Sequence, residues 1–517
     1  MSKMSKRYSE NKYVDVMDFN DDDDEVKPKK KKKNNNKKAA KTVTNDAPVI
    51  AAKDIRVYKR IIAFFVVIFS LLCAYFIFFV AVRSKDFASN PYNPRLNSMS
   101  KQVTRGTIYS ADGQVLAEST VSAAGTEVRN YPYGREFAHA VGYSVNGMAG
   151  VELLENYDLL TSSIDTIDKA KGSVTGEKLP GDSVVTTLDT TLQNVAYKGM
   201  GDYYGAAIAI DPDTGKILLM VSNPDFDPNS ISEDWESLTS SDSSVLVNRA
   251  TQGLYPPGST FKILTALEFL DEGKDTEETY RCRGRLKVGD YTIHCAGNEV
   301  HGSQTIKKAF ANSCNCFFAN AGLELNSSEF STLADRLLFN QKLPTKLKNT
   351  SESKFSLKSS DPDSKKMQVA IGQSDTVVTP LHMCMISSAI AADGVLYEPY
   401  IVDHTENVNG EVIKQNSPEA YKKLLSDIQV SELKDYMRYA VTNGTARKLR
   451  TDAYDAYGKT GTAEYTEDKS KTHSWFTGFA EKDGKKLAVA VIMEGAGTGS
   501  KHAVPLAKEI FDTYFSE

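Results

Sequence analysis

The 517-residue sequence is poor in the side chains from which metal centres are usually built. It contains six cysteines and seven histidines, and the histidines are scattered without a His-Glu-x-x-His pattern. Cys314 and Cys316 are only one residue apart in a helix-like stretch, a spacing that does not favour zinc. The sequence therefore predicts no metal and no cofactor.

The few cysteines also restrict disulfide bonding. Cys73 lies in a long apolar run, which leaves five others, so at least one of these stays unpaired within the chain. Those five are Cys282, Cys295, Cys314, Cys316 and Cys384. A disulfide between Cys282 and Cys295 is compatible with an oxidising compartment, and the sequence leaves that question open.

Neither sign of charge is in large excess. The chain has 62 lysines and arginines and 67 aspartates and glutamates, which gives a formal net charge of -5. This balance does not suggest a nucleic-acid-binding protein. Charge is nevertheless uneven near the N-terminus, where an acidic run (21–25) precedes a block of lysine and asparagine (27–38). Few apolar residues interrupt this region, so residues 1–56 are predicted to be a disordered cytoplasmic tail. The lysine block either contacts anionic lipid or a cytoplasmic partner, or is simply solvated.

Long apolar runs are absent except for one, Ile61 to Val82. At about 1.5 Å per residue it spans the roughly 30 Å hydrocarbon core of a bilayer. It is too long for a cleaved signal peptide, so residues 57–83 are predicted to be a transmembrane signal-anchor helix in the lipid bilayer. Four basic residues precede it between 53 and 60, against Arg83 and Lys85 after it. This bias predicts a single-pass plasma-membrane protein with a cytoplasmic N-terminus and residues 84–517 outside.

Residues 84–185 show no catalytic signature. The segment 90–95, Asn-Pro-Tyr-Asn-Pro-Arg, is predicted to be an extended connector. Residues 105–117 indicate two short strands around an Asp-Gly turn. We interpret 84–185 as a small, irregular pedestal or dimerisation-type domain, with no obvious pair of catalytic carboxylates for sugar polymerisation.

Residues 186–517 predict an α+β domain. Two apolar hairpins, 205–222 and 474–493, lie near its two ends, and the middle, 261–440, is mostly helical and loop. We therefore expect an antiparallel sheet assembled from both ends, flanked by helices and interrupted by a helical insert. This arrangement places the helix that follows Ser259 against the sheet.

That helix follows Tyr-Pro-Pro-Gly, a sequence that cannot continue a helix, and it is predicted to begin at about Ser259. Ser259 and Lys262 then project from one face of its first turn. A serine beside a desolvated lysine is one way to activate a nucleophile without histidine. The same S-x-x-K spacing recurs elsewhere, as at Ser431 and Lys434. The plain alternative is an N-cap serine with a solvated lysine.

Two further motifs carry candidate partners. Ser313 and Asn315 stand two residues apart in an apolar stretch, where they either face a cleft or cap a helix.

Lys459-Thr460-Gly461-Thr462 precedes the last hairpin, as an edge strand would. There Gly461 would let a ligand backbone approach and the threonines would offer hydroxyl and N–H groups. Lys459 would bind a carboxylate and help lower the pKa of Lys262; alternatively it is a solvated turn lysine.

In the order S-x-x-K, S-x-N, K-T-G, the three motifs resemble the signature of penicillin-binding proteins and class A β-lactamases. The sequence also contains Arg-Gly-x-Ile at the start of the pedestal, Tyr-Pro-Pro-Gly-Ser-Thr-Phe-Lys and Lys-Thr-Gly-Thr-Ala-Glu. With these stretches, the chain resembles a class B penicillin-binding protein, in particular the short PbpA-like members. The fold implied is the penicillin-binding transpeptidase fold. Cysteine in the middle of S-x-N departs from the commonest pattern.

The resemblance implies D,D-transpeptidation of peptidoglycan stem peptides through an acyl-enzyme on Ser259, with Lys262 as general base. Ser313, Asn315 and Lys459 would complete the catalytic set, and Thr460, Gly461 and Thr462 would bind substrate. It also implies acylation by β-lactams and a separate membrane glycosyltransferase partner of the FtsW/RodA kind.

Other functions remain as alternatives. A class A β-lactamase would need a deacylating glutamate, usually in Glu-x-x-Leu-Asn, and none occurs between Asn315 and Lys459. A D,D-carboxypeptidase would share the same motifs. A non-catalytic β-lactam sensor or wall-binding scaffold would be expected to carry a signalling domain or several spans.

Overall fold

The computed structural model describes residues 52–83, 93–122, 126–165, 169, 177–240, 242, 244–465 and 471–516. Most of the predicted disordered tail, and part of the 90–95 connector, lie outside these ranges. The described residues fall into two units, one ending at Phe78 and one from Phe79 to the C-terminus.

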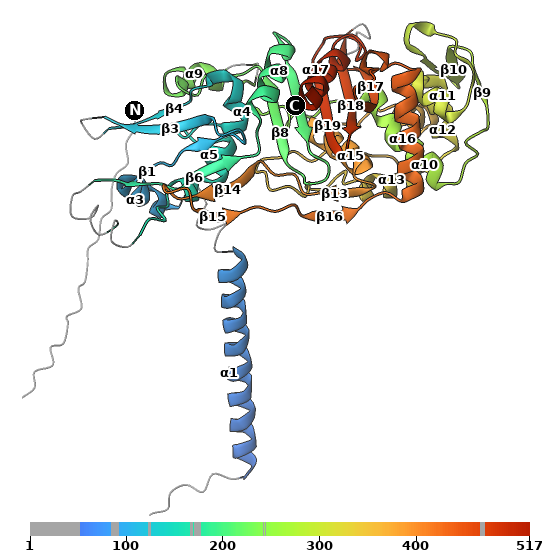
Figure 1. The fold of residues 1–517 in the computed structure, drawn as a ribbon. Helices are drawn as coiled ribbons and strands as arrows, with labels where there is room; N and C mark the ends of the chain where they lie inside the picture. Colours follow the sequence, from blue (N-terminus) through green and yellow to red (C-terminus); the bar gives the residue numbers. More distant parts are fainter. Residues whose placement is uncertain are drawn as a thin grey trace, which may run out of the picture. The chain divides into compact units, whose positions relative to one another are not determined.

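The first unit contains the long helix α1 (Ala52–Phe78), which is followed by a short π-helix, η1 (Phe79–Arg83). Within the described residues, the stretch Ile55–Arg83 is the one helical segment long and apolar enough to cross a membrane, and its apolar side chains are exposed. Its 29 residues reach about 43 Å at about 1.5 Å per residue, more than a bilayer core requires. The predicted membrane span therefore corresponds to a continuous helix (Figure 1).

The pedestal forms the N-terminal part of the second unit. Its elements are α3 (Pro94–Gln102), β1 (Val103–Thr104), β2 (Ile108–Tyr109), β3 (Val115–Val121), β4 (Glu127–Asn130), η2 (Gly134–Phe137), α4 (Ala138–Val141), α5 (Gly150–Leu154), α6 (Asn156–Leu159), β5 (Leu179–Pro180) and β6 (Ser183–Thr186). The predicted strands around the Asp-Gly turn are β2 and β3, which pair antiparallel.

The prediction of an extended connector is wrong for its described end. Helix α3 begins at Pro94, and the side chain of Asn93 caps it by accepting a hydrogen bond from Arg95 N at 3.1 Å. Proline at the first helical position has no N–H to leave unpaired, and asparagine is a preferred N-cap. The same Asn-Pro pair that suggested a linker therefore starts a helix.

The Arg-Gly pair that opens the pedestal is built into its core. Arg105 donates to the buried carboxylate of Glu152 at 2.5 Å, and Arg129 donates to the same carboxylate at 2.8 Å. A side chain at Gly106 would collide with Asp182 O, since a Cβ there would lie 1.9 Å from it. Buried charges are tolerated when they are paired in this way.

The pedestal sheet contains strands from a distant part of the sequence. Its order is β15-β14-β6-β2-β3-β4, in which β14 (Val402–Glu406) and β15 (Val412–Gln415) come from the C-terminal half. β14 pairs antiparallel with β6 from Val402 opposite Thr186 to Glu406 opposite Ser183. The sheet therefore joins the pedestal to the following domain.

The central sheet of the C-terminal domain has the order β17-β18-β19-β7-β8, and all its pairings are antiparallel. Its strands are β7 (Gly205–Ile210), β8 (Ile217–Asn223), β17 (Asp455–Glu464), β18 (Thr472–Lys482) and β19 (Lys485–Met493). The prediction of an antiparallel sheet assembled from both ends of the domain is confirmed. β17, which carries Lys-Thr-Gly, is an edge strand.

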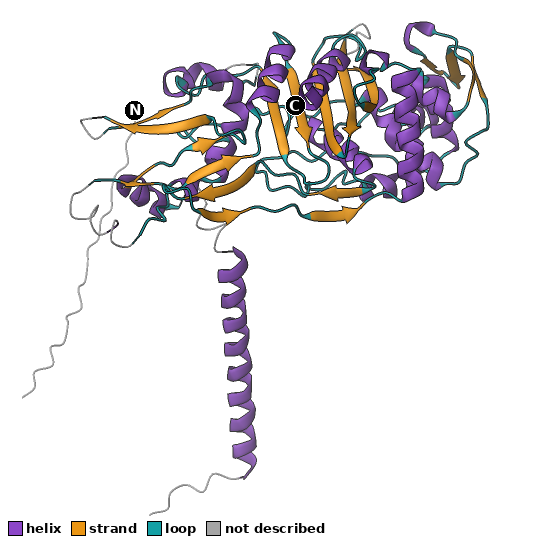
Figure 2. Ribbon diagram, viewed as in Figure 1, coloured by secondary structure: helices purple, strands orange, loops and turns teal. Residues whose placement is uncertain are grey.

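Helices cover both faces of this sheet (Figure 2). Ala207 and Ala209 in β7 pack with α8 (Thr190–Met200) and α17 (Ala503–Ser516), whereas Ala206 and Ile208 belong to the core shared with α15 (Pro380–Ala391). Successive side chains of a strand point to opposite faces, so a strand that is apolar at every position is buried on both sides.

The insert between β8 and β17 is mainly helical, as predicted (Figure 1). Its helices are α9 (Ile231–Ser240), η3 (Gly258–Phe261), α10 (Lys262–Asp271), η4 (Ala296–Asn298), α11 (Ile306–Ala311), α12 (Asn315–Glu324), α13 (Ser327–Arg336), α14 (Asp363–Val369), α16 (Asp427–Thr442) and η5 (Arg447–Leu449), besides α15. It also contains the short strands β9 (Tyr280–Cys282), β10 (Arg285–Val288), β11 (Tyr291–His294), β12 (Gly302–Gln304), β13 (Val395–Tyr397) and β16 (Ala420–Lys423), which pair as β9-β12, β10-β11 and β13-β16. Many of the insert's helices group at one end of the sheet, whereas α9 packs with the pedestal and α15 packs against a face of the sheet.

Candidate active site

Ser259 lies in η3, a single 3-10 turn that runs directly into α10. The helix thus starts one residue before the predicted position, with Gly258 in a left-handed conformation at φ 52°. Ser259 is partly exposed, and within the described part of the chain its hydroxyl has no hydrogen-bond partner. The hydroxyl is therefore free to meet a ligand.

Lys262 is fully buried one turn after Ser259. Its Nζ donates to Asn315 Oδ1 at 2.6 Å, to Ser313 O at 2.8 Å and to Ser313 Oγ at 3.2 Å. Below it lies the ring of Phe318, with its centroid 5.4 Å from Nζ. The alternative of a solvated first-turn lysine is excluded by this burial.

Ser313 lies in the turn between α11 and α12, and Asn315 is the first residue of α12. Ser313 has φ 54°, a left-handed conformation that serine rarely adopts and that often marks functional sites. The cap of α12 is Cys314, whose Sγ accepts from Phe317 N at 3.5 Å, so the motif polar groups are not used as helix caps. Asn315 instead donates from Nδ2 to His294 O at 2.9 Å, which orients its amide toward Lys262.

Lys459 is also fully buried, on the edge strand β17. Its Nζ donates to Ser313 Oγ at 2.9 Å and to Thr460 O at 3.0 Å. The Ser313 hydroxyl thus lies between two lysine amines, those of Lys262 and Lys459. A shared hydroxyl of this kind can pass a proton from one amine to the other because it both donates and accepts hydrogen bonds.

Burial controls the protonation of both lysines. It lowers the pKa of Lys262 to about 8, although the nearby cysteine sulfurs favour the charged form. Burial also lowers the pKa of Lys459 well below its ordinary value, and the charge of Lys262 lowers it further. Repulsion between two amines is mutual, so it favours the neutral form of either lysine, and the help of Lys459 in lowering the pKa of Lys262 stays a prediction. Among the described ion pairs, neither amine has a carboxylate partner.

The nucleophile turn and β17 fit together closely. A Cβ at Gly258 would lie 2.8 Å from Thr462 O, and a Cβ at Gly461 would lie 3.0 Å from Pro257 O. Real Cβ atoms need more room than this, so the two glycines allow η3 to pack on the strand. The structure therefore gives Gly461 a packing role, and the close approach of a ligand stays a prediction.

The structure thus brings the predicted residues of all three motifs together around one small region. Thr460 is buried and shares a hydrogen bond of 2.7 Å with Thr445 Oγ1, whereas Thr462 is partly exposed beside Gly258. The sequence interpretation did not include Thr445. No local motif marks this residue, because it reaches Thr460 only through the packing of the preceding helix α16 against β17.

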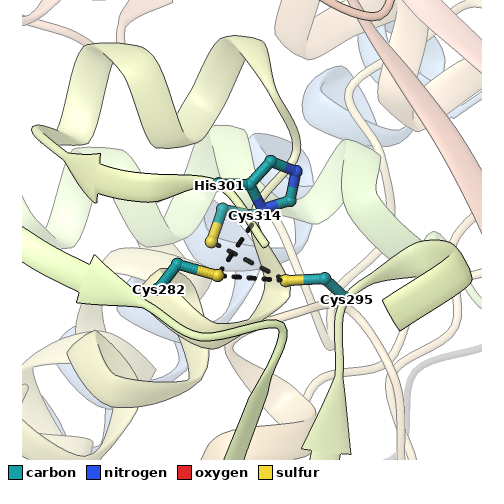
Figure 3. Close-up of side chains that lie close together, drawn as sticks. All are labelled: Cys282, Cys295, His301 and Cys314. Atoms are coloured by element: carbon teal, nitrogen blue, oxygen red, sulfur yellow. Dashed lines mark hydrogen bonds between the residues drawn. The ribbon is translucent and has the colours of Figure 1, made fainter. Parts of the chain in front are cut away.

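A cluster of cysteines and one histidine is a second feature that the sequence did not reveal. Cys282, Cys295, His301 and Cys314, which we call the Cys3His cluster, come from separate segments, yet their ligand atoms lie within 4.8 Å of one another (Figure 3). The spacing of Cys314 and Cys316 alone does not indicate such a cluster. Cys282, Cys295 and His301 reach the S-x-N turn only because the strand pairs β9-β12 and β10-β11 fold there.

Comparison with protein families gives two matches along the chain. The family described as the penicillin-binding protein transpeptidase domain matches residues 205–512. The family described as the penicillin-binding protein A dimerisation domain matches residues 105–184. Together they cover the pedestal strands β2 to β6 and the domain that holds all three motifs.

Individual proteins agree with these matches. The peptidoglycan D,D-transpeptidase PbpA of Mycolicibacterium smegmatis is 31% identical over 455 residues, covering 81% of this chain and 91% of that protein. Penicillin-binding protein A from M. tuberculosis, solved as a ceftriaxone acyl-enzyme complex, has a TM-score of 0.73 at 26% identity and covers 81% of this chain and 99% of the other. The D,D-transpeptidase domain of a peptidoglycan glycosyltransferase from Eggerthella lenta has a TM-score of 0.71 at 30% identity, covering 80% and 99%.

Proposed function

This chain belongs to the family of penicillin-binding protein transpeptidases, and on that basis we propose that it is a membrane-anchored peptidoglycan D,D-transpeptidase acting through a serine acyl-enzyme. One observation carries the proposal: the buried amine of Lys262 lies one turn after a free Ser259 hydroxyl and is held by Ser313 and Asn315. The acyl-enzyme complex of a relative supports the same chemistry.

In acylation, Ser259 Oγ attacks the carbonyl carbon of the penultimate D-alanine of a stem peptide. Neutral Lys262 accepts the hydroxyl proton, which its lowered pKa permits at neutral pH. The carbon–nitrogen bond to the terminal D-alanine then breaks. The leaving amine takes a proton through the Ser313 hydroxyl, which both lysines contact.

The oxyanion that forms in this step needs donors in place beforehand. We assign the backbone N–H groups of Ser259 and Thr462 to it, because η3 and β17 pack directly on each other. Such donors are typically worth about 2.7–4 kcal/mol each in acyl transfer. Lys459, Thr460 and Thr462 would receive the terminal carboxylate of the substrate, and Asn315 would orient its amide groups. A peptide in extended form can lie along the open edge of β17.

An amine from a neighbouring stem peptide then attacks the acyl-enzyme carbonyl, which forms the cross-link and releases Ser259. A β-lactam follows only the first half of this course. Its ring amide acylates Ser259, and its leaving nitrogen stays tethered, so the acyl-enzyme persists.

In our proposal, the membrane helix anchors the catalytic domain on the outer side of the plasma membrane. Basic residues gather before the span, which favours a cytoplasmic N-terminus and an extracytoplasmic catalytic domain. Because the sequence shows no candidate for sugar polymerisation, we further propose a separate membrane glycosyltransferase partner of the FtsW/RodA kind.

The decisive experiment is labelling of the full-length protein in detergent with a fluorescent penicillin, with the adduct mapped by mass spectrometry. We expect one covalent adduct on Ser259, which Ser259→Ala abolishes. Ser431→Ala is the matched control, because Ser431 has the same S-x-x-K spacing but is exposed on α16, and its labelling should be unchanged.

Two outcomes would change the conclusion. Rapid loss of the label would identify a hydrolase, either a D,D-carboxypeptidase or a β-lactamase, in place of a transpeptidase. Folded protein that takes no label on Ser259 would favour a wall-binding scaffold.

A further inference from the structure

We propose that Thr445 is a positioning residue for substrate recognition. Its hydroxyl orients the hydroxyl of Thr460, so that Thr460 donates a hydrogen bond to the terminal carboxylate of a stem peptide or to the carboxylate of a β-lactam. The two hydroxyl oxygens lie 2.7 Å apart, the usual length of an O–H···O hydrogen bond. This role rests on the proposed function, in which Thr460 helps to receive that carboxylate.

The backbone of Thr445 is held by contacts that do not involve its hydroxyl. It lies in the segment 443–446, which follows α16. The N–H of Thr445 donates to Ala311 O, at the end of α11, over 3.0 Å. Gly444 packs on the same carbonyl, since a Cβ there would lie only 2.2 Å from Ala311 O, and Ala446 is fully buried. The Thr445 side chain therefore leaves the backbone from a fixed point.

Thr445 joins the S-x-N and K-T-G motifs. It is hydrogen-bonded to the end of α11, two residues before Ser313, and to Thr460 of β17. Lys459 Nζ, which donates to Ser313 Oγ, also donates to Thr460 O at 3.0 Å. Successive side chains of a strand point to opposite faces. An anion at the open edge of β17 would therefore meet the Lys459 amine from one side and the Thr460 hydroxyl from the other.

The two threonine hydroxyl groups depend on each other. Thr460 is only 6% exposed, and Thr445 is partly exposed. Within the described part of the chain, the hydrogen bond between them is the only one that either hydroxyl makes. A hydroxyl carries one proton and can also accept, so in the free protein either oxygen can be the donor.

A bound carboxylate removes this ambiguity, because a carboxylate only accepts hydrogen bonds. When Thr460 gives its single proton to the carboxylate, it can bond to Thr445 only as the acceptor, and Thr445 becomes the donor. Hydrogen bonds in such a chain polarise one another, and a bond to an ionised acceptor is stronger than one to a neutral acceptor. The Thr445 hydroxyl should therefore favour ligands with a charged carboxylate.

The test compares acylation of Ser259 by benzylpenicillin with acylation by its methyl ester, which lacks the negative charge. Both rates are measured by mass spectrometry on the full-length protein in detergent. Thr445→Val keeps nearly the same shape but has no hydroxyl, so it should slow the reaction with benzylpenicillin about fivefold and leave the reaction with the ester almost unchanged. Thr445→Ser keeps the hydroxyl and should retain both rates.

Thr442→Val is the matched control. Thr442 lies near the end of α16, and its hydroxyl bonds to Asn443 Oδ1 at 2.7 Å and to carbonyl groups of its own helix. Both of its rates should stay at the natural values. Thr445→Ala removes the same hydroxyl without a branched apolar side chain, and it replaces Thr445→Val if thermal melts show that the valine variant does not fold.

A double variant shows whether Thr445 acts through Thr460. Thr460→Val should by itself slow acylation by benzylpenicillin, and addition of Thr445→Val should then slow it no further. A further loss of about fivefold in the double variant would mean that Thr445 contacts the carboxylate directly, which would overturn the positioning role.

The remaining outcomes separate this role from the proposed function. Equal slowing of benzylpenicillin and its ester by Thr445→Val would show a purely structural effect, and undiminished acylation by benzylpenicillin would show no effect. Either result would overturn the positioning role and leave the transpeptidase assignment intact. Folded natural protein that takes no penicillin on Ser259 would instead overturn the proposed function, and the role of Thr445 with it.

Discussion

At the scale of single residues, the site is governed by the removal of two amines from water. Lys262 and Lys459 are both fully buried and contact the same Ser313 hydroxyl. Burial penalises the charged form of each, and two cations close together penalise it further. The consequence is a base that is available near neutral pH without a histidine.

The pH dependence of acylation should therefore follow Lys262. With its pKa at about 8, about one molecule in ten carries the neutral amine at pH 7, against about one in three thousand for a lysine at 10.5. Only the neutral amine accepts a proton, so the penicillin acylation rate should rise about tenfold between pH 6 and pH 7. It should then level off above about pH 8.

Stopped-flow acylation across this range provides the measurement, with thermal melts at each pH to confirm folding. A rate that keeps rising up to pH 10 would contradict a lowered pKa. A rate independent of pH would show that Lys262 is not the base.

At the scale of elements, catalysis depends on how closely η3 approaches β17. Gly258 permits this approach because it combines φ 52° with the absence of a side chain that would meet Thr462 O. Position 258 therefore couples the nucleophile to the strand that carries Lys459.

Gly258→Ala should damage this contact. A left-handed alanine costs roughly 1–2 kcal/mol, and its Cβ must also displace the strand. Since small shifts of reacting groups can cost up to about 100-fold, we expect penicillin acylation to fall about 10- to 100-fold.

Gly113→Ala is the matched control. Gly113 has φ 77° in the β2–β3 turn, and no atom lies within 4 Å of its Cβ position. It should lose some thermal stability but acylate normally. Equal acylation rates for the two variants would show that the η3–β17 contact is not critical.

At the scale of the whole molecule, the pedestal and the catalytic domain are joined through one sheet. β14 lies beside β6, and Val402 is buried in a core that also includes Ile108 and Val184. We therefore expect residues beyond the membrane helix to unfold as one cooperative unit.

Val402→Ala tests this expectation by calorimetry. Loss of its methyl groups should destabilise the protein by roughly 1–3 kcal/mol and lower the temperature of a single transition. Val412→Ala, at a position that is 53% exposed on β15, should leave it almost unchanged. Two transitions, of which only the first moves in Val402→Ala, would show independent domains.

Sequence reasoning succeeded where the signal is local and failed where it is not. The apolar hairpins and the three motifs are each continuous in sequence, so their strands and their shared chemistry were predictable. Pairing of β14 with β6, the contact of Thr445 with Thr460, and the Cys3His cluster each join segments separated by loops. The start of α3 is a different case, because Asn-Pro is compatible with both a linker and a helix cap; in the structure it caps a helix whose Leu96 is buried.

The pair of buried lysines imposes opposing requirements on the substrate cycle. Capture of a peptide by its terminal carboxylate is strongest when Lys459 carries a proton, whereas attack by Ser259 requires Lys262 to lack one. Because the two amines repel each other's charge, arrival of the carboxylate would draw the shared proton toward Lys459 and leave Lys262 ready to act. Binding of the substrate carboxylate would then itself leave Lys262 neutral and activate Ser259. That carboxylate belongs to the terminal D-alanine, which the enzyme releases in the next step.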